Sequence, residues 1–314
     1  MKFLIFGAGA IGSVIGGFLA KAGHEVTLVS RHKHIKAIKR SGLTIKGIWG
    51  RNFIPAEKFS GLLTKTAPGD FDYILLTVKS YDTESAAEQM KKTLVRAPLV
   101  VSMQNGLGNI EILEKHLGKK RVAGARLIFG ARALSPGRVE VTVIAQPTAV
   151  GSKHKTLDRY RENMLRKLSD ALDSAGVPAE YVGDVIPYLW AKAFYNAALN
   201  PLSALLQRSY GELAENPFTK QIMNSVIDET FTVAKAMGVK LFWKNSDEYN
   251  RYFYKKLVPP TASHYASMLS DLKKGKTEIN SINGAILALA RKKNIPVPVN
   301  KVLTLLVKAR CRQL

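Results

Sequence analysis

The chain opens with an apolar segment, Lys2–Phe6, that runs directly into a G-x-G-x-x-G sequence, Gly7-Ala-Gly-Ala-Ile-Gly12. After a strand, Gly7 permits a tight turn, Gly9 lets backbone N–H groups approach a pyrophosphate, and Gly12 lets the next helix pack closely on the sheet. The positive end of that helix then faces the anion. The opening residues therefore predict a dinucleotide-binding βαβ unit rather than a glycine-rich turn without a ligand. The predicted cofactor-binding residues of this loop are Gly7, Ala8, Gly9, Ala10, Ile11 and Gly12.

The second predicted strand, Glu25–Ser30, ends in Ser30-Arg31 without a carboxylate. Folds specific for NAD usually carry Asp or Glu here, which accepts hydrogen bonds from the ribose 2′-hydroxyl. A carboxylate would repel a 2′-phosphate, whereas a guanidinium can hold it through two parallel hydrogen bonds. We therefore predict NADP(H) rather than NAD(H), with Arg31 as the residue that contacts the phosphate. The basic residues of the following segment, 33–40, are interpreted as a solvated helix face.

The first half of the chain alternates short apolar strands, such as Asp72–Val78 and Leu99–Met103, with helical segments. This alternation predicts a mostly parallel, doubly wound sheet. The apolar alternation over 137–151 indicates antiparallel hairpin strands, and after about Asp184 only helical patterns follow. The predicted fold is an α/β Rossmann-type domain over residues 1–183 followed by an all-α domain over residues 184–314, which would carry substrate binding, catalysis and dimerisation.

Composition restricts the compartment and the partners. Cys311 is the only cysteine, so no intrachain disulfide can form, which fits a reducing cytoplasm. There is no run of 18 apolar residues, and the first strand begins at Lys2, so we expect a cytoplasmic protein without a membrane span or a signal peptide. The net charge of +23 raises the question of nucleic acid. The basic residues are spread along the chain without interleaved aromatics, so we expect a basic surface and no specific nucleic-acid binding. No metal site is expected.

Lys192, Asn196 and Asn200 fall at i, i+4 and i+8 among apolar neighbours, and therefore on one face of a predicted helix. Asparagine is a poor residue for a helix interior, and a lysine among apolar residues can have its pKa lowered toward the range useful for proton transfer. The spacing fits a catalytic face and an exposed polar stripe equally well.

Three further segments are candidates by position. Gln104-Asn105-Gly106 and Thr77-Val-Lys79 each follow a predicted strand, where a cofactor or substrate contact is expected, although Asn-Gly is also a common turn. Thr277-Glu278-Ile follows a glycine, and spacing alone favours the first turn of a helix for Glu278.

Taken together, these segments resemble the ketopantoate reductase (2-dehydropantoate 2-reductase) family. The resemblance extends in order from Met1 to about Val299. The motifs that carry it are Gly-Ala-Gly-Ala-Ile-Gly, Leu-Thr-Val-Lys-Ser-Tyr, Gln-Asn-Gly, the Lys192-x3-Asn196-x3-Asn200 helix and Ser-Met-Leu-x-Asp…Thr-Glu-Ile-x-x-Ile-Asn-Gly. It implies reduction of ketopantoate to (R)-pantoate by NADPH, a step toward pantothenate and coenzyme A. Family members are often dimers through the helical domain, so a homodimer is a further expectation.

The resemblance also implies residue roles. Lys192 matches the catalytic lysine, which protonates the keto oxygen as hydride arrives, and Glu278 matches the acid that helps bind substrate and orients the lysine. The remaining matches are Asn196 and Asn200 to contacts with the substrate hydroxyl and carboxylate, Asn105 to the nicotinamide–substrate junction, Ser267 to the substrate carboxylate, and Arg31 and Lys79 to cofactor phosphates.

One segment departs from the family pattern. The stretch Gly275–Asn280 is one residue shorter before Thr277, and Asn280 stands where aspartate is common, which puts the register between Ser267 and Glu278 in question. Two alternatives remain open. One is an NADP-dependent reductase of another branched 2-keto acid on the same scaffold. The other, motivated by the charge, is a non-catalytic NADP-binding or nucleic-acid-associated protein.

Overall fold

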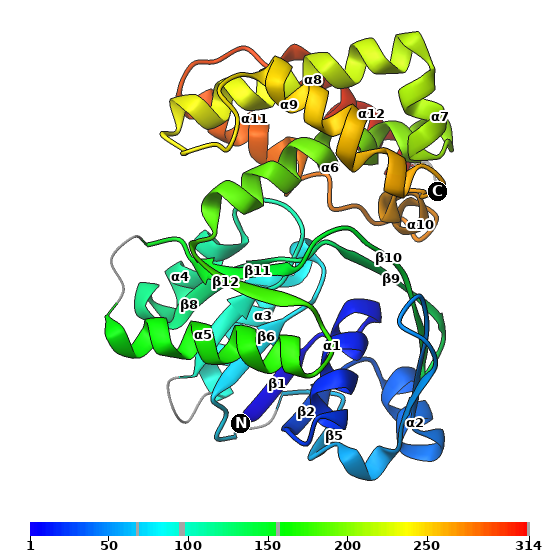
Figure 1. Ribbon diagram of the computed structural model, residues 1–314, viewed down its shortest axis with the longest axis vertical. Helices are drawn as coiled ribbons and strands as arrows, with labels where there is room; N and C mark the ends of the chain where they lie inside the picture. The colour runs from blue at the N-terminus through cyan, green and yellow to red at the C-terminus, as the bar shows by residue number, and fades with distance from the viewer. Residues whose placement is uncertain (67–68, 94–97, 155–157, 313–314) are drawn as a thin grey trace. The chain divides into compact units, whose positions relative to one another are not determined.

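The computed structural model describes residues 1–66, 69–93, 98–154 and 158–312 and divides into two compact units (Figure 1). The first unit comprises Met1–Gln104 and Asn109–Val185, and the second comprises Asn105–Gly108 and Ile186–Leu314. Within the described part of the chain, no helix is both long enough and apolar enough to cross a bilayer.

The first unit is built on an eight-stranded sheet, counted over the described residues, in the order β12-β11-β8-β7-β6-β1-β2-β5. Neighbouring strands pair in parallel except for β8 and β11, which are antiparallel. The mostly parallel sheet confirms the predicted fold class. The strands are β1 (Lys2–Phe6), β2 (Glu25–Val29), β5 (Gly61–Leu63), β6 (Tyr73–Leu76), β7 (Leu99–Ser102), β8 (Val122–Arg126), β11 (Thr148–Ser152) and β12 (Ala179–Asp184).

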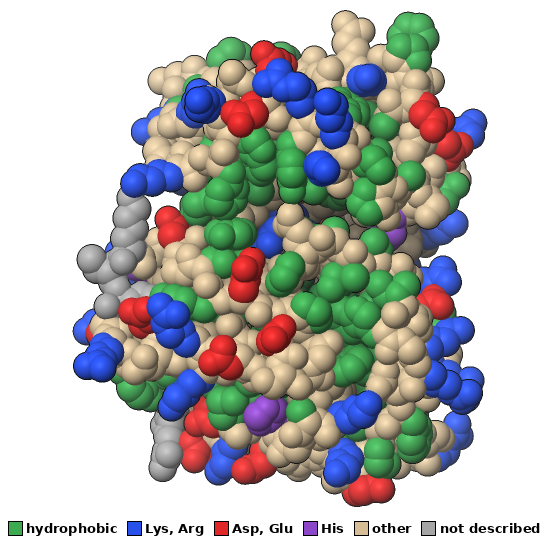
Figure 2. Space-filling view, viewed as in Figure 1, with side chains coloured by type: hydrophobic (Ala, Val, Ile, Leu, Met, Phe, Trp, Pro, Cys, Tyr) green, Lys and Arg blue, Asp and Glu red, His purple; other side chains and the backbone are tan. Residues whose placement is uncertain are grey.

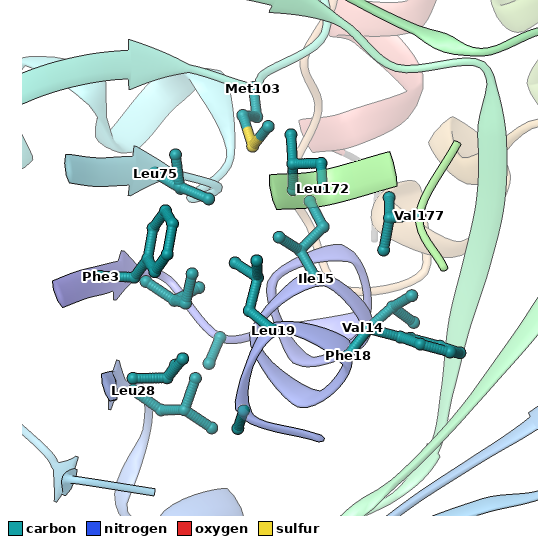
Figure 3. Close-up of a cluster of buried hydrophobic side chains, with 14 of the residues drawn as sticks. Phe3, Val14, Ile15, Phe18, Leu19, Leu28, Leu75, Met103, Leu172 and Val177 are labelled. Atoms are coloured by element: carbon teal, nitrogen blue, oxygen red, sulfur yellow. The ribbon is translucent and has the colours of Figure 1, made fainter. Parts of the chain in front are cut away.

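Helices cover the sheet in two pairs: α1 packs against α5, and α3 packs against α4. Side chains alternate between the faces of a strand, and Phe3 and Ile5 of β1 accordingly lie in the buried cluster formed with α1 and α5. Figure 3 shows Ile15 and Leu19 of α1 directed toward strand residues and Leu172 of α5. The helices are α1 (Ala10–Lys21), α2 (His32–Ser41), α3 (Thr83–Thr93), α4 (Asn109–Leu117) and α5 (Arg159–Ser174), with short 3₁₀ turns η1 (Ala56–Lys58), η2 (Ser80–Asp82) and η3 (Lys119–Arg121).

Both strands of the 137–151 segment have an antiparallel neighbour, as expected, but the expectation of a hairpin between these two strands is wrong. β10 (Arg138–Ile144) pairs antiparallel with the preceding β9 (Phe129–Ser135), and β11 joins the large sheet instead. The reason is the Gly137 turn between β9 and β10: its φ of +75° suits glycine and reverses the chain there. β10 also pairs in parallel with β3 (Leu43–Gly47), which is antiparallel to β4 (Asn52–Ile54), so these strands form a separate small sheet.

The described part of the second unit is helical around a core that includes Phe194, Phe231, Tyr249 and Phe253. Its helices are α6 (Ile186–Leu206), α7 (Tyr210–Glu215), α8 (Pro217–Ala236), α9 (Ser246–Tyr252), α10 (Ser267–Leu272), α11 (Asn283–Lys292) and α12 (Pro298–Arg312), with a π-helical turn η4 (Phe253–Leu257) and a 3₁₀ turn η5 (Pro259–Thr261).

The first helical turn expected at Glu278 is also wrong, because α11 begins only at Asn283. The Thr277 hydroxyl accepts a hydrogen bond from the Ile279 N–H at 3.1 Å, and the Gly284 N–H donates to the Ile279 carbonyl at 2.8 Å. These bonds close a turn in place of the predicted start of the helix.

Candidate functional site

The β1–α1 loop has the backbone shape that glycine alone supplies. Gly7 has φ +105°, and a Cβ there would stand 2.6 Å from the backbone nitrogen of Val78. A Cβ on Gly12 would stand 2.5 Å from the Thr77 hydroxyl oxygen, whereas one on Gly9 would meet only a carbonyl oxygen at 3.9 Å. The first and third glycines are therefore required by packing, and the space around Gly9 is open to a ligand.

Hydrogen bonds hold this loop against the ends of β2 and β6. The Gly7 and Ala8 N–H groups donate to the Val29 carbonyl at 3.1 and 2.8 Å. The Ser30 hydroxyl donates to the Ala8 carbonyl at 2.8 Å, and the Thr77 hydroxyl donates to the Gly7 carbonyl at 2.8 Å. The N–H groups in the first turn of α1 have no acceptor within their own helix, so this rigid loop suits a phosphate.

Arg31 lies at the N-cap position of α2, directly after β2, and is exposed. Lys33, Lys36 and Lys39 of α2 are also exposed, as expected for a solvated face. In Figure 2, Lys and Arg side chains are dense along the border of the first unit where α2 lies in Figure 1. The end of β2 therefore presents positive charge and no carboxylate.

His34 joins α2 to the glycine loop. Its Nδ1 accepts from the Gly137 N–H at 3.1 Å, so its ring proton lies on Nε2, which faces the Ser13 hydroxyl at 2.9 Å. Ser13 in turn donates to the Ala8 carbonyl at 3.3 Å. Burial, and secondarily the Arg31 charge, lowers the pKa of His34 below its usual value, so the ring is held neutral.

The carboxyl ends of β6 and β7 lie beside that of β1, since Leu76 pairs with Phe6 on one side and Ser102 on the other. Lys79 follows β6 and is half-buried in front of η2. Gln104 belongs to a candidate contact segment, and its side chain is used within the fold: Nε2 donates to the Val78 carbonyl at 3.1 Å and to the Thr83 hydroxyl at 2.7 Å. Gln104 thereby fixes the Lys79 loop to the end of β7.

The short segment Asn105–Gly108 belongs to the second unit, although both flanking segments belong to the first. The Leu107 N–H donates to the Ser281 carbonyl at 2.8 Å. Gly106 has φ +86°, and a Cβ there would stand 2.4 Å from that same oxygen. The Ser281 hydroxyl donates to the Glu278 carbonyl at 2.9 Å, so the candidate residues Asn105 and Glu278 lie on two segments that are bonded together.

The polar face of α6 lies in the same unit. Asn196 and Asn200 are 6% and 5% exposed, and Lys192 is half-buried. The Tyr210 hydroxyl donates to Asn200 Oδ1 at 2.8 Å, and burial raises the pKa of Tyr210 well above its usual value, so this donor stays protonated. The bond directs the two Nδ2 hydrogens of Asn200 toward other acceptors. No sequence signal identified Tyr210.

The two remaining candidates differ in burial. Glu278 is 5% exposed, whereas Ser267, at the start of α10, is exposed. The residue before Ser267, Ala266, donates its N–H to the Ser203 hydroxyl of α6 at 3.1 Å. The candidates thus separate by unit. Those in the first are the glycine loop, Arg31 and Lys79; those in the second are Asn105, Lys192, Asn196, Asn200, Ser267 and Glu278.

Metal-binding groups and cavities were also sought outside the candidate site residues. Among the described residues, no group of three or more His, Cys, Asp and Glu side chains could hold a metal ion. A cavity of about 620 Å³ is lined by Lys91 and residues 116–121. It lies by the amino end of β8, at the opposite edge of the sheet from the glycine loop, so it does not belong to the candidate site.

Comparison with known proteins gives two family matches. Residues 3–155 match the family "Ketopantoate reductase PanE/ApbA", and residues 184–311 match "Ketopantoate reductase PanE/ApbA C terminal". A 2-dehydropantoate 2-reductase of Aquifex aeolicus is 43% identical over 99% of this chain and 97% of its own length.

Two solved structures are similar over the whole chain. A PanE/ApbA family ketopantoate reductase from Ralstonia eutropha has 34% identity and a TM-score of 0.87, covering 100% of this chain and 99% of its own. A D-mandelate dehydrogenase in a ternary structure with NADH and anilino(oxo)acetate has 26% identity and a TM-score of 0.88, with the same coverage.

Proposed function

The chain belongs to the ketopantoate reductase family of oxidoreductases, and from this membership we propose that it reduces 2-dehydropantoate to (R)-pantoate with NADPH. The product would feed pantothenate and coenzyme A synthesis. The observation that carries the proposal is the grouping of the α6 face, the Glu278 turn and the Asn105 segment in one unit. These segments hold the amide, ammonium and carboxylate groups that binding and protonating a keto acid require.

The residues present fit a dinucleotide. The open space at Gly9, the first turn of α1 and the fixed loop suit a pyrophosphate, and an exposed Arg31 in place of an acid favours a 2′-phosphate. Lys79 is the further candidate for a phosphate contact. When bound, NADPH supplies the hydride that the reduction needs.

We assign proton donation to Lys192. Its ammonium group would hydrogen-bond the keto oxygen, polarise the carbonyl and transfer a proton to that oxygen as the carbon gains hydride. A carboxylate at Glu278 would orient the ammonium group toward the keto oxygen before transfer. One proton and one hydride convert the ketone to the alcohol.

The amide residues would select the substrate. Asn196 and Asn200 would donate to the hydroxyl and carboxylate of the keto acid, with Asn200 oriented by Tyr210. Asn105 would contact both substrate and nicotinamide. Ser267, which is exposed, would contact the substrate carboxylate.

A second candidate is reduction of another 2-keto acid, branched or aromatic. The similarity to a D-mandelate dehydrogenase favours it, because mandelate is a 2-hydroxy acid of a different shape. The two candidates share the chemistry assigned to Lys192 and differ only in the side chain that the site accepts.

The test is oxidation of NADPH followed at 340 nm with ketopantoate, 2-oxoisovalerate and phenylglyoxylate, and then repeated with NADH. Preferred turnover of ketopantoate with NADPH supports the proposal. Preference for another keto acid supports the second candidate. NADPH binding without turnover of any keto acid contradicts both.

A further inference from the structure

Helix α6 contains a proline in its interior. Pro201 lies within the helical range Ile186–Leu206, and it has no N–H to donate to the carbonyl four residues earlier, that of Ala197. Ala197 is fully buried. A buried carbonyl without a donor is costly, so another group must replace the lost bond.

Asn283, the first residue of α11, supplies that donor. Its Nδ2 donates to the Ala197 carbonyl at 3.0 Å and also to Asn300 Oδ1 at 3.0 Å. Asn283 is fully buried, and its Oδ1 has no hydrogen-bond partner among the described residues. The side chain thus uses both of its donors and leaves its acceptor unused.

A carboxylate on α8 determines this orientation. Glu229 Oε2 accepts from Asn300 Nδ2 at 2.7 Å, and Glu229 also accepts from the N–H groups of Val299 and Asn300 at 2.8 and 2.9 Å. Because an ionised carboxylate only accepts, the Asn300 amide must point its nitrogen at Glu229 and its oxygen at Asn283. A flipped Asn283 would then place its oxygen against two other acceptors.

We propose that Asn283 is a positioning residue for the keto-acid site, because it replaces the backbone donor that Pro201 lacks. Ala197 lies between Asn196 and Asn200 in the sequence, and Asn283 follows directly on the turn that carries Glu278. One hydrogen bond therefore keeps the amide face of α6 in register with the Glu278 turn. This inference rests on the substrate-binding role proposed for that face.

The test is a double-mutant cycle of Asn283→Ala and Pro201→Ala in the full chain. Alanine at 201 restores an N–H that reaches the Ala197 carbonyl within the helix, so the second substitution should rescue the first. We expect Asn283→Ala to raise the KM for ketopantoate about 10- to 100-fold, as for a displaced binding group. The double variant should return to within about threefold of the wild-type KM.

The KM for ketopantoate distinguishes a positioning role of Asn283 from a merely structural one. Partial unfolding lowers the concentration of active enzyme, and hence the apparent kcat, but leaves the KM of the remaining molecules unchanged. The KM for NADPH should change much less than the KM for ketopantoate, since the predicted phosphate contacts of the cofactor, Arg31 and Gly7–Gly12, belong to the other unit. The proposal is overturned if Asn283→Ala leaves the KM for ketopantoate unchanged. It is also overturned if Asn283→Ala raises this KM by the same factor with and without Pro201→Ala.

Asn224→Ala is the matched control. Asn224 of α8 accepts from the Tyr254 hydroxyl at 2.8 Å, so its loss also removes a side-chain hydrogen bond in the second unit. Pro201→Ala should not rescue this variant. If Asn283→Ala alone fails to fold, the inference requires the double variant to fold, and failure of both contradicts it.

Failure of the proposed function can be distinguished from failure of the inference about Asn283. If the wild type reduces none of the keto acids, the proposed function is wrong, while the Tm values of the same four proteins still measure the coupling. A lower Tm for Asn283→Ala that Pro201→Ala restores then supports the replaced bond, and additive Tm changes reject it.

Discussion

The glycine loop and the polar face of α6 differ in what holds their binding groups. In the loop the proposed ligand contacts are backbone N–H groups, and a turn and a helix start within Gly7–Gly12 determine their directions. On α6 they are side chains, and partners elsewhere in the chain determine how they point. Tyr210 orients Asn200, and Asn283 completes the hydrogen bonding of the turn between Asn196 and Asn200.

The difference shows that a backbone site is encoded locally, whereas a side-chain site is distributed over the fold. A substitution in the loop changes the site itself. For the α6 face, a substitution elsewhere in the chain can remove a supporting partner while every proposed binding side chain stays present. Variants of both kinds test this contrast.

The largest effect is expected from Lys192→Ala, which removes the assigned proton donor. General acid catalysis contributes about 10²- to 10⁴-fold, so kcat should fall by roughly three orders of magnitude while NADPH binding, measured by fluorescence, is retained. Lys301→Ala, an exposed lysine of α12, is the control for loss of a positive charge. Near-normal turnover of Lys192→Ala would refute the mechanism.

Gly106→Ala should be the next most damaging change. Its Cβ would collide with the Ser281 carbonyl at 2.4 Å, so the segment that carries Asn105 must move away from the Glu278 turn. A displacement of about 1 Å can cost about 100-fold in kcat/KM.

Gly108→Ala provides the matched control for that substitution. Gly108 has φ +92°, close to the +86° of Gly106, but a Cβ added there would have no atom within 4 Å. Both variants therefore carry the same backbone strain, and only Gly106→Ala adds a collision. Equal losses in the two would show that strain, and not the contact with Ser281, accounts for the effect.

Arg31→Ala tests the cofactor side of the comparison. A charge-assisted hydrogen bond contributes about 1.5–3 kcal/mol, so loss of the guanidinium should raise the KM for NADPH about 10- to 100-fold and leave that for NADH unchanged. Arg40→Ala, at the other end of α2, should change neither. An equal rise in the KM for NADPH and in the KM for NADH would argue against a contact between Arg31 and the 2′-phosphate.

The fold was predictable where a signal is local. The strand Lys2–Phe6 has the predicted bounds, because an apolar run and the glycine after it mark them. The partners of the 137–151 segment were not predictable, since alternation identifies a strand but not the strand beside it. The acid at Glu278 resembled a helix start, yet the hydroxyl of Thr277 closes a turn there instead.

The candidate site shows the same division. The motifs identified the residues with recognisable chemistry, whose roles stay predictions. They gave no sign of Tyr210, Gln104 or Asn283 as supporting residues, because the sequence does not show which side chains meet after folding. Nor did they indicate that Asn105–Gly108 belongs to the helical unit.

Tyr210→Phe removes one supporting bond and keeps the ring. Loss of a neutral hydrogen bond costs about 1 kcal/mol, so the KM for ketopantoate should rise roughly fivefold as Asn200 loses its fixed orientation. Tyr254→Phe removes an equivalent tyrosine–asparagine bond, to Asn224, and should leave that KM unchanged. Identical kinetics of the two variants would show that Asn200 needs no such support.

The smallest effect concerns His34, which supports the glycine loop as a neutral ring. Its pKa is lowered in the folded state by burial and by Arg31, so below the ordinary value of 6.5 the unfolded chain binds the proton more readily. The contribution of neutral His34 to the free energy of unfolding is therefore fully present above about pH 6.5 and is lost as the pH falls through the lowered pKa.

The loss at low pH should be measurable by urea unfolding between about pH 7.5 and pH 5. Protonated Nδ1 could no longer accept from the Gly137 N–H, so His34→Ala should be less stable at pH 7.5 but lose less stability on acidification than the wild type. His32→Ala removes a neighbouring exposed imidazole as the control. If His34→Ala keeps the full pH dependence, the other histidines with lowered pKa values, His24 and His264, must carry it, and the loop does not depend on a neutral His34.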